Sequence, residues 1–142
     1  MIIDSGKRQE FQTGAVRDIQ KGKGRCDLLP LDIVATILDG DFILIRINDF
    51  LKENNVMCLY NALRFFGETC LYTMILQVAI QFEEGAEKYG ENNWKKGIPI
   101  NCYINSAISH YLKYKRGDVD ESHDRAFVWN ILCAIWTHKN LS

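Results

Sequence analysis

Apolar residues recur every three to four positions through the second half of the chain, which is the spacing of one face of an α-helix. The clearest series runs from residue 71 to residue 89, and Gly90 follows it as a helix end. Its apolar positions are Leu71, Ile75, Val78, Phe82, Ala86 and Tyr89. Because they form one stripe along about five turns, we expect a core helix that buries this stripe.

Two more helices are predicted to follow. Ile98-Pro99 opens the first and Arg116-Gly117 closes it, and the second runs from Asp120 to about His138. Their apolar positions are Ile104, Ala107, Ile108, Tyr111 and Leu112 in the first helix and Phe127, Val128, Ile131, Ile135 and Trp136 in the second. The connection between them is tight, so the two helices are expected to pack as antiparallel neighbours.

The first half of the chain has weaker patterns. Pro30 suits the first turn of a short helix that ends at Asp39-Gly40, and residues 56–66 are better interpreted as a helix than as a strand. Residues 41–55 alternate poorly and fit either a strand or a helix. Because no series of strands is convincing, we predict an all-α fold, a helical bundle.

Composition and charge narrow the class of protein. With 142 residues, 47% of them hydrophobic, the chain fits one globular domain over 1–142. It carries 17 Lys plus Arg against 18 Asp plus Glu, and the net charge of -1 gives no general attraction to nucleic acids or anionic membranes. We therefore expect neither of them as a partner.

The absence of targeting signals and the cysteine usage favour the cytoplasm. The N-terminus has no apolar signal region, and no uncharged run approaches the roughly 18 residues of a membrane span. The five cysteines are scattered and never form a C-x-x-C pair, which is typical of free thiols in a reducing compartment. We expect a cytoplasmic protein.

Residues 1–25 are polar and basic, and glycines separate their charges. The basic residues towards the end of this segment are Arg17, Lys21, Lys23 and Arg25. The segment is expected to be an arm or loop without a core of its own, and a solvated terminus is the alternative to a functional arm.

A first cluster of carboxylates lies near the end of the predicted helix 71–89. Glu83, Glu84 and Glu87 form an E-E-x-x-E pattern beside the apolar stripe. Negative charge at a helix C-terminus opposes the helix dipole, so this placement calls for a cation or another reason. A solvated helix edge is the alternative.

A second cluster straddles the predicted start of the last helix and comprises Asp118, Asp120, Glu121 and Asp124. Asp118 and Glu121 match a capping box, but Asp124 falls in the middle of the apolar arc, where capping does not explain it. A buried carboxylate costs several kcal/mol unless it is paired or bound to a metal. Two such clusters supply the oxygen ligands that Mg²⁺ or Mn²⁺ prefers, so together they predict a divalent-metal site inside a helical bundle.

Basic and aromatic residues follow the first cluster. A divalent-metal site suits phosphate chemistry, and Lys88 and Lys95 are candidate phosphate contacts. Asn93 and Trp94, in the loop after the acidic helix, are candidates for holding a base by hydrogen bonds and stacking. For Trp94, packing of a loop aromatic against the bundle is the alternative.

His123-Asp124, with His110 upstream, is superficially similar to the H…HD…D metal site of HD-domain phosphohydrolases. No aspartate follows Asp124, so the last ligand of that site has no candidate. His110 lies on the polar side of its helix, where a substrate or interface contact competes with plain exposure, and we assign it no catalytic role. P-loop and Rossmann motifs do not occur in the chain.

Several long words of the sequence are similar to one known family. They are residues 22–30 (GKGRCDLLP), 82–99 (FEEGAEKYGENNWKKGIP), 105–123 (NSAISHYLKYKRGDVDESH) and 126–130 (AFVWN). They resemble the dATP/dGTP diphosphohydrolase (MazZ-like) family of phages and bacteria, within the all-α, MazG-like nucleoside triphosphate pyrophosphohydrolases. Relative to compact members, residues 31–70 look like an insertion, expected to be helical.

This resemblance implies an enzyme and its site. Water would attack the α-phosphorus of a deoxynucleoside triphosphate, dATP or dGTP being favoured, and give the monophosphate and pyrophosphate. The implied ligands of Mg²⁺ or Mn²⁺ are Glu83, Glu84, Glu87, Glu121 and Asp124, of which the four glutamates are the implied catalytic residues. Many members carry an apolar residue at the position of Asp124, so Asp118, Asp120 or His123 are substitutes for it.

The resemblance also concerns the arm and the assembly. The basic arm is expected to close over the nucleotide, with Lys23 and Arg25 as contacts, because its glycines let backbone amides approach a phosphate closely. The family usually forms dimers or tetramers, so a homo-oligomer is expected. The alternative function is that of a non-catalytic helical interaction protein of a phage or prophage, whose acidic clusters only cap helices and keep the surface polar.

Overall fold

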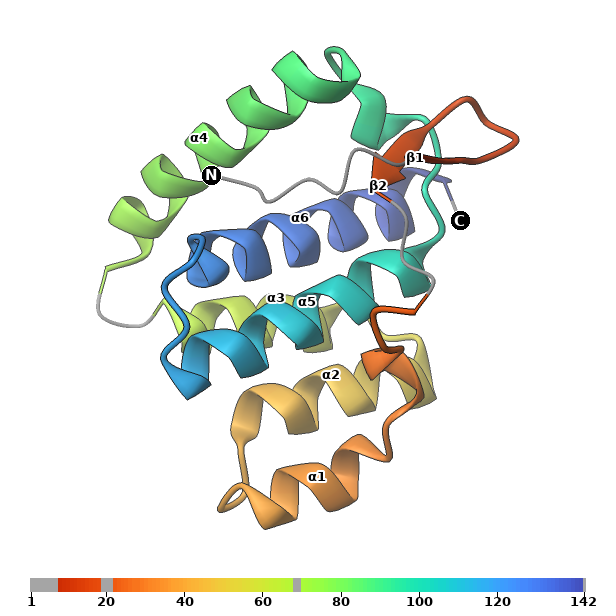
Figure 1. The fold of residues 1–142 in the computed structure, drawn as a ribbon. Coiled ribbons are helices and arrows are strands. Elements are labelled where there is room, and N and C mark those ends of the chain that lie inside the picture. The colour runs from red at the N-terminus through yellow and green to blue at the C-terminus, as the bar shows by residue number, and fades with distance from the viewer. Residues whose placement is uncertain (1–7, 19–21, 68–69, 142) are drawn as a thin grey trace.

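The computed structural model describes residues 8–18, 22–67 and 70–141, and it is a helical bundle with one small hairpin (Figure 1). Six α-helices account for most of the described residues. They are α1 (Leu31–Ile37), α2 (Phe42–Glu53), α3 (Met57–Phe66), α4 (Leu71–Tyr89), α5 (Ile100–Arg116) and α6 (His123–Leu141). The predicted all-α class is therefore confirmed.

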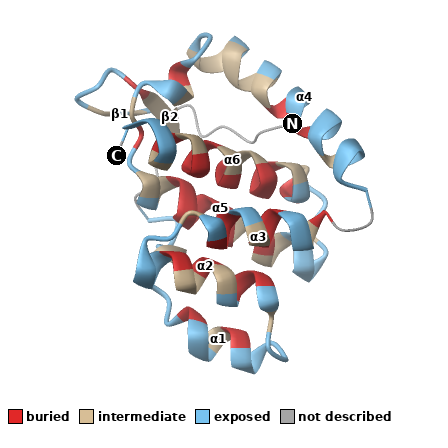
Figure 2. Ribbon diagram, turned by 180° about the vertical axis from the view of Figure 1, so that it is seen from behind, coloured by how far each residue is buried: buried red, intermediate tan, exposed pale blue. Residues whose placement is uncertain are grey.

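The pair α5 and α6 forms the centre of the bundle and is antiparallel, as the tight connection between the two helices predicts (Figure 2). The inward sides of both helices are buried, including Ile104 and Ile108 on α5 and Phe127 and Ile131 on α6. Gly117 ends α5 with a φ of 94°, a left-handed conformation that costs a residue without Cβ little. This conformation turns the chain back towards α6.

The last helix begins at His123 rather than at Asp120, so its predicted start is wrong by three residues. Asp118 does not form the expected capping box, because its carboxylate instead accepts from Nε and Nη2 of Arg116. Residues 117–122 therefore stay outside the helices as a loop beside α5, and this loop carries Asp118, Asp120 and Glu121.

Residues 31–66 form the helical layer α1, α2 and α3, which packs on the central pair (Figure 1). The ambiguous segment 41–55 is helical because Asp41 caps α2, its carboxylate accepting from the Leu44 amide at 3.0 Å. The same carboxylate accepts a hydrogen bond from the Tyr111 hydroxyl, which ties this layer to α5.

The N-terminal segment forms a small hairpin that packs against the bundle. Strands β1 (Arg8–Glu10) and β2 (Val16–Asp18) pair antiparallel, and Ala15 between them is fully buried. The Asn93 side chain, in the 3₁₀ turn Asn93–Lys95, accepts from the Val16 amide at 2.8 Å and donates to the Val16 carbonyl at 2.6 Å. The described part of this segment therefore packs on the core of the bundle and is not a solvated terminus, while Lys21 lies outside the described residues.

Helix α4 has the predicted bounds but buries less than predicted. Val78 is buried and Phe82 is half-buried, whereas Leu71 and Ile75 of the expected stripe are exposed. The helix lies along one edge of the bundle and packs on α6 (Figure 2). No helix of the described ranges is by itself long and apolar enough to cross a membrane, and only the bent pair α3 and α4 together meets that test.

Candidate functional site

A cleft of about 780 Å³ lies where the N-terminal hairpin, α4, α5 and α6 meet. Part of its lining is aromatic: Phe82 and Trp129 have ring centroids 5.9 Å apart, and Tyr89 lines the cleft near them. Polar side chains also line it, among them Arg17, Ser106, Ser109, His110, Lys113, Glu121 and Asn130. An apolar wall with a few convergent polar groups is the usual character of a small-molecule site.

A cluster of two histidines and two carboxylates borders the cleft, which His110, Asp120 and Glu121 line. The Nδ1 atoms of His110 and His123 are 2.9 Å apart, and Nε2 of His123 is 2.7 Å from Asp120 Oδ1. Glu121 Oε1 is 3.6 Å from His110 Nδ1. Burial, and then the nearby His123, lowers the pKa of His110 to about 3, so this imidazole is neutral at physiological pH.

This cluster fits a divalent metal ion. Two groups of the described residues have ligand atoms that all lie within 4.8 Å of one another: His110, Glu121 and His123, and Asp118, Asp120 and His123. Neutral imidazole and carboxylate are both metal ligands, and the first group combines them beside the cleft. Of the predicted ligands it contains Glu121, with His123 among the substitutes for Asp124.

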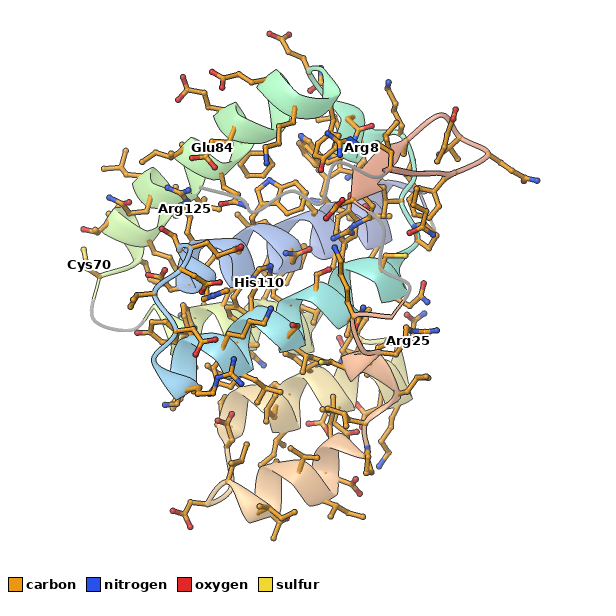
Figure 3. All side chains as sticks on the ribbon, in the orientation of Figure 1. Arg8, Arg25, Cys70, Glu84, His110 and Arg125 are labelled. Atoms are coloured by element: carbon orange, nitrogen blue, oxygen red, sulfur yellow. The ribbon has the colours of Figure 1, made fainter. Side chains whose placement is uncertain are left out.

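The E-E-x-x-E carboxylates lie elsewhere on α4. Glu83 and Glu87 are exposed and do not line the cleft. Glu84 is half-buried and accepts from Arg125 Nη2 at 3.1 Å, and Arg125 Nε donates to Gln81 at 3.0 Å. Figure 3 shows Glu84 and Arg125 facing each other between α4 and α6. Within one chain, the three carboxylates and Glu121 thus form no common group among the described residues.

Asp124 is exposed, so its expected burial in the apolar arc is wrong. It lies in the first turn of α6, where negative charge is favourable because the N-terminal end of the helix dipole is positive. Its side chain borders a smaller hollow of about 290 Å³, which Tyr114 and Arg125 also line.

Three of the predicted substrate contacts line the cleft: Lys23, Asn93 and Trp94. Lys23 Nζ is 2.7 Å from Asp18 Oδ2. Asn93 uses both amide atoms to hold Val16, so its role in the structure is to dock the hairpin. The Trp94 ring packs between Phe82 and Trp136, which matches the packing alternative.

The other three predicted contacts do not line the cleft: Arg25, Lys88 and Lys95. Arg25 is exposed and forms a two-bond ion pair with Asp27, at 2.8 and 2.7 Å. Lys95 Nζ lies over the rings of Trp94 and Trp136. Arg25 and Lys95 are therefore both exposed and engaged in local contacts.

Sequence reasoning missed part of the cleft. Ser106, His110 and Lys113 recur at the spacing of one helix face, and this signal was visible. The similarity to the H…HD…D site was the sequence signal that associated His110 with His123, but we assigned His110 no role because that site lacks its last aspartate here. Arg17 was visible only as one charge of the arm, and no local pattern indicated that it reaches α5 and α6.

The fold is all-α, and its cleft borders a cluster of candidate metal ligands. The model of the family described as dATP/dGTP diphosphohydrolase, N-terminal, matches residues 62–141 of this chain. The match covers more than half of the chain, and the chain belongs to this family, whose name describes a diphosphohydrolase. No curated protein and no solved structure gives a match.

The matched region contains α4, α5 and α6, and it begins inside α3. The hairpin, α1 and α2 precede it. That residues 31–70 are an insertion within the family stays a prediction.

Proposed function

We propose that this protein hydrolyses deoxynucleoside triphosphates, dATP and dGTP before others, to the monophosphate and pyrophosphate. Family membership supports the reaction class. The observation that carries the proposal is the cleft, which joins an aromatic wall to a histidine and carboxylate cluster in one space of about 780 Å³. Aromatic rings stack on bases, whereas cations and metal ligands engage phosphates.

The proposed cofactor is Mn²⁺ or Mg²⁺, held by His110, Glu121 and His123. A bound divalent ion neutralises phosphate charge and lowers the pKa of an attacking water. The imidazole nitrogens favour Mn²⁺ over Mg²⁺, because Mg²⁺ prefers oxygen ligands alone. The wider ligand set that the resemblance implies, with Glu83, Glu84, Glu87 and Asp124, stays a prediction.

The chain's own residues would bind and orient the substrate along the cleft. Lys113 places positive charge in its lining, which attracts the triphosphate, and Lys23 lies beside it in an ion pair with Asp18. Phe82 and Trp129 offer ring faces for the base. The Asp120 carboxylate accepts from His123 Nε2, and this contact orients the His123 ring towards His110.

The test is product identity. The protein is incubated with each common deoxynucleoside triphosphate and Mn²⁺ or Mg²⁺, and the products are separated by ion-exchange chromatography. We expect monophosphate and pyrophosphate in equal amounts, fastest from dATP or dGTP. Inorganic tripolyphosphate as product would instead support HD-type chemistry, and no turnover with either metal would support the non-catalytic alternative.

We also propose that α4 mediates a homo-oligomer. Tyr72, Ile75, Leu76 and Ile80 lie on one side of this helix and are exposed, Tyr72 by 84% and Leu76 by 72%. The opposite side packs on α6 through Val78, so α4 is apolar on both sides. A row of exposed apolar side chains along a helix is normally covered, so this side of α4 calls for a second surface.

A second copy of the chain is the proposed cover. Glu83 and Glu87 continue the exposed side of α4 towards its C-terminal end. If two copies pair antiparallel about a two-fold axis, their acidic ends lie far apart, so like charges do not meet. This arrangement would bring the E-E-x-x-E carboxylates to a subunit interface.

A further inference from the structure

Arg17 extends from β2 into the cleft and is held there by three neutral groups. Its Nη2 donates to Ser106 Oγ at 2.9 Å and to Asn130 Oδ1 at 3.5 Å. The guanidinium carbon lies 5.3 Å from the centre of the Tyr103 ring. Asn130 is itself fixed, because its amide donates to the Ala126 carbonyl at 2.8 Å. The guanidinium therefore has one defined position between α5 and α6.

This guanidinium carries a charge that the described residues do not neutralise. Arg17 Nη1 is buried and has no hydrogen-bond partner in the described part of the chain, and no described carboxylate forms an ion pair with Arg17. Lys23 and Arg25 differ, because Asp18 and Asp27 pair with them. A charge in such a place is costly unless an anion accompanies it. An anion from outside the chain would supply the missing partner.

The position of Arg17 relative to the metal cluster indicates which anion fits. Ser106, which holds Arg17, lies about one turn of α5 before His110, about 6 Å along the helix axis. Lys113 lines the cleft almost one turn beyond His110. Arg17, the cluster and Lys113 thus form a row of about 10 Å along α5. A row that alternates cations with metal ligands is complementary to an extended polyphosphate.

We infer that Arg17 Nη1 is an anion subsite that donates to a phosphoryl oxygen of the substrate, so that the triphosphate lies along Ser106, His110 and Lys113 of α5. The inference rests on the proposed function and refines it, since it assigns the polyphosphate to one wall of the cleft and one arginine to its recognition. Among the basic residues of the N-terminal segment, it singles out Arg17 rather than Lys23 or Arg25.

The test measures binding without turnover. Isothermal titration calorimetry with inorganic tripolyphosphate, with Mn²⁺ and separately with a chelator, compares the wild type with Arg17→Gln and Arg17→Lys. The matched control is Arg64→Gln, which removes the same charge from an exposed position on α3 outside the cleft. Deoxyadenosine and deoxyguanosine, which lack phosphates, serve as probes of the base site.

We expect Arg17→Gln to weaken tripolyphosphate binding at least about 10-fold, the loss typical of a charge-assisted hydrogen bond. Arg17→Lys should keep part of the affinity, because it retains the charge but not the planar donors. Arg64→Gln should bind as the wild type does, and nucleoside binding should be unchanged in all variants. Ser106→Ala, which keeps the charge but removes the hydroxyl that orients it, should give a smaller loss.

Folding is checked by the melting temperature of each variant, and Arg17→Lys and Ser106→Ala keep the test valid if Arg17→Gln does not fold. Wild-type tripolyphosphate affinity in Arg17→Gln would overturn the inference. Lost nucleoside binding with retained tripolyphosphate binding would also overturn it, in favour of a base contact. If the wild type cleaves dATP but binds no tripolyphosphate, the subsite is wrong and the proposed function stands. If Arg17-dependent binding occurs without any turnover, the subsite stands and the proposed function is wrong.

Discussion

Arg125 is the residue that links the first acidic cluster to the rest of the molecule. From α6 it contacts both Gln81 and Glu84 on α4, and its side chain is only 10% exposed in the ion pair with Glu84. Replacing one residue of a partly buried ion pair lowers the stability of the fold, because the other charge then stays in the protein without a partner. Glu84 therefore has a structural partner as well as its predicted role at the metal.

The two roles are separable by comparing Glu84→Gln with Glu87→Gln. The resemblance implies that both carboxylates serve the metal, so each variant is expected to lose at least about 10²-fold in turnover. Only Glu84→Gln should also lower the melting temperature, by a few degrees, because Glu87 is exposed and Glu84 bonds Arg125. Steady-state pyrophosphate release and thermal unfolding measure the two effects. Unchanged turnover in both variants would assign the E-E-x-x-E pattern to a solvated helix edge.

At the scale of elements, α4 and the N-terminal hairpin pack on the central pair in different ways. Asn93 docks the hairpin by holding Val16, and Asn105 Oδ1 accepts from the amide of Cys26, in the 3₁₀ turn Cys26–Leu28 that follows the hairpin, at 2.6 Å. Both asparagines are buried and line the cleft. Helix α4, by contrast, touches the bundle along one side only and leaves the other side apolar and exposed.

Leu76→Glu tests the proposed role of α4. A charge in the middle of the exposed apolar side should turn the oligomer into a monomer, because a carboxylate buried between two copies costs several kcal/mol. Light scattering after size-exclusion chromatography gives the mass of each species. Gln77→Glu is the matched control, since it adds the same charge at an exposed position on another side of the same helix, and it should stay oligomeric. A monomeric wild type at tens of micromolar would contradict the proposal.

At the scale of the whole molecule, the cleft exists only because segments far apart in sequence meet. Arg17 from the hairpin, His110 from α5 and Asn130 from α6 line one space. Most of the buried polar side chains among the described residues border it, including Asn105 and Ser106. Polar groups buried together around a hollow are typical of a binding site rather than of a core.

A metal ion bound by the histidine and carboxylate cluster should stabilise the whole fold. Binding to the native state alone raises the free energy of unfolding by about 2.7 kcal/mol when the metal is present at 100 times its dissociation constant. We therefore expect Mn²⁺ to raise the melting temperature by several degrees and a chelator to reverse the effect. His123→Ala should abolish the shift, whereas His138→Ala, near the other end of α6, should preserve it. An equal shift in His123→Ala would exclude the histidine and carboxylate cluster as the metal site.

The sequence by itself determined the helices of the second half and the family. The bounds of α4 match the apolar period residue for residue, and the buried sides of α5 and α6 follow from theirs, because helix period and end signals such as Gly90 and Gly117 are local. The sequence words around residues 82–130 likewise indicated the family that the match over residues 62–141 establishes. Such words need no knowledge of which residues touch.

Tertiary structure alone decided which side chains meet. Most of residues 41–55 are helical because Asp41 caps the helix and accepts a hydrogen bond from Tyr111. Helix α4 packs on α6 along one side only. The contact between His110 and His123 and the reach of Arg17 to Asn130 depend on how the loop 117–122 and the hairpin pack. These contacts join residues 13 and 113 positions apart, and no local period or charge pattern specifies pairings over such separations.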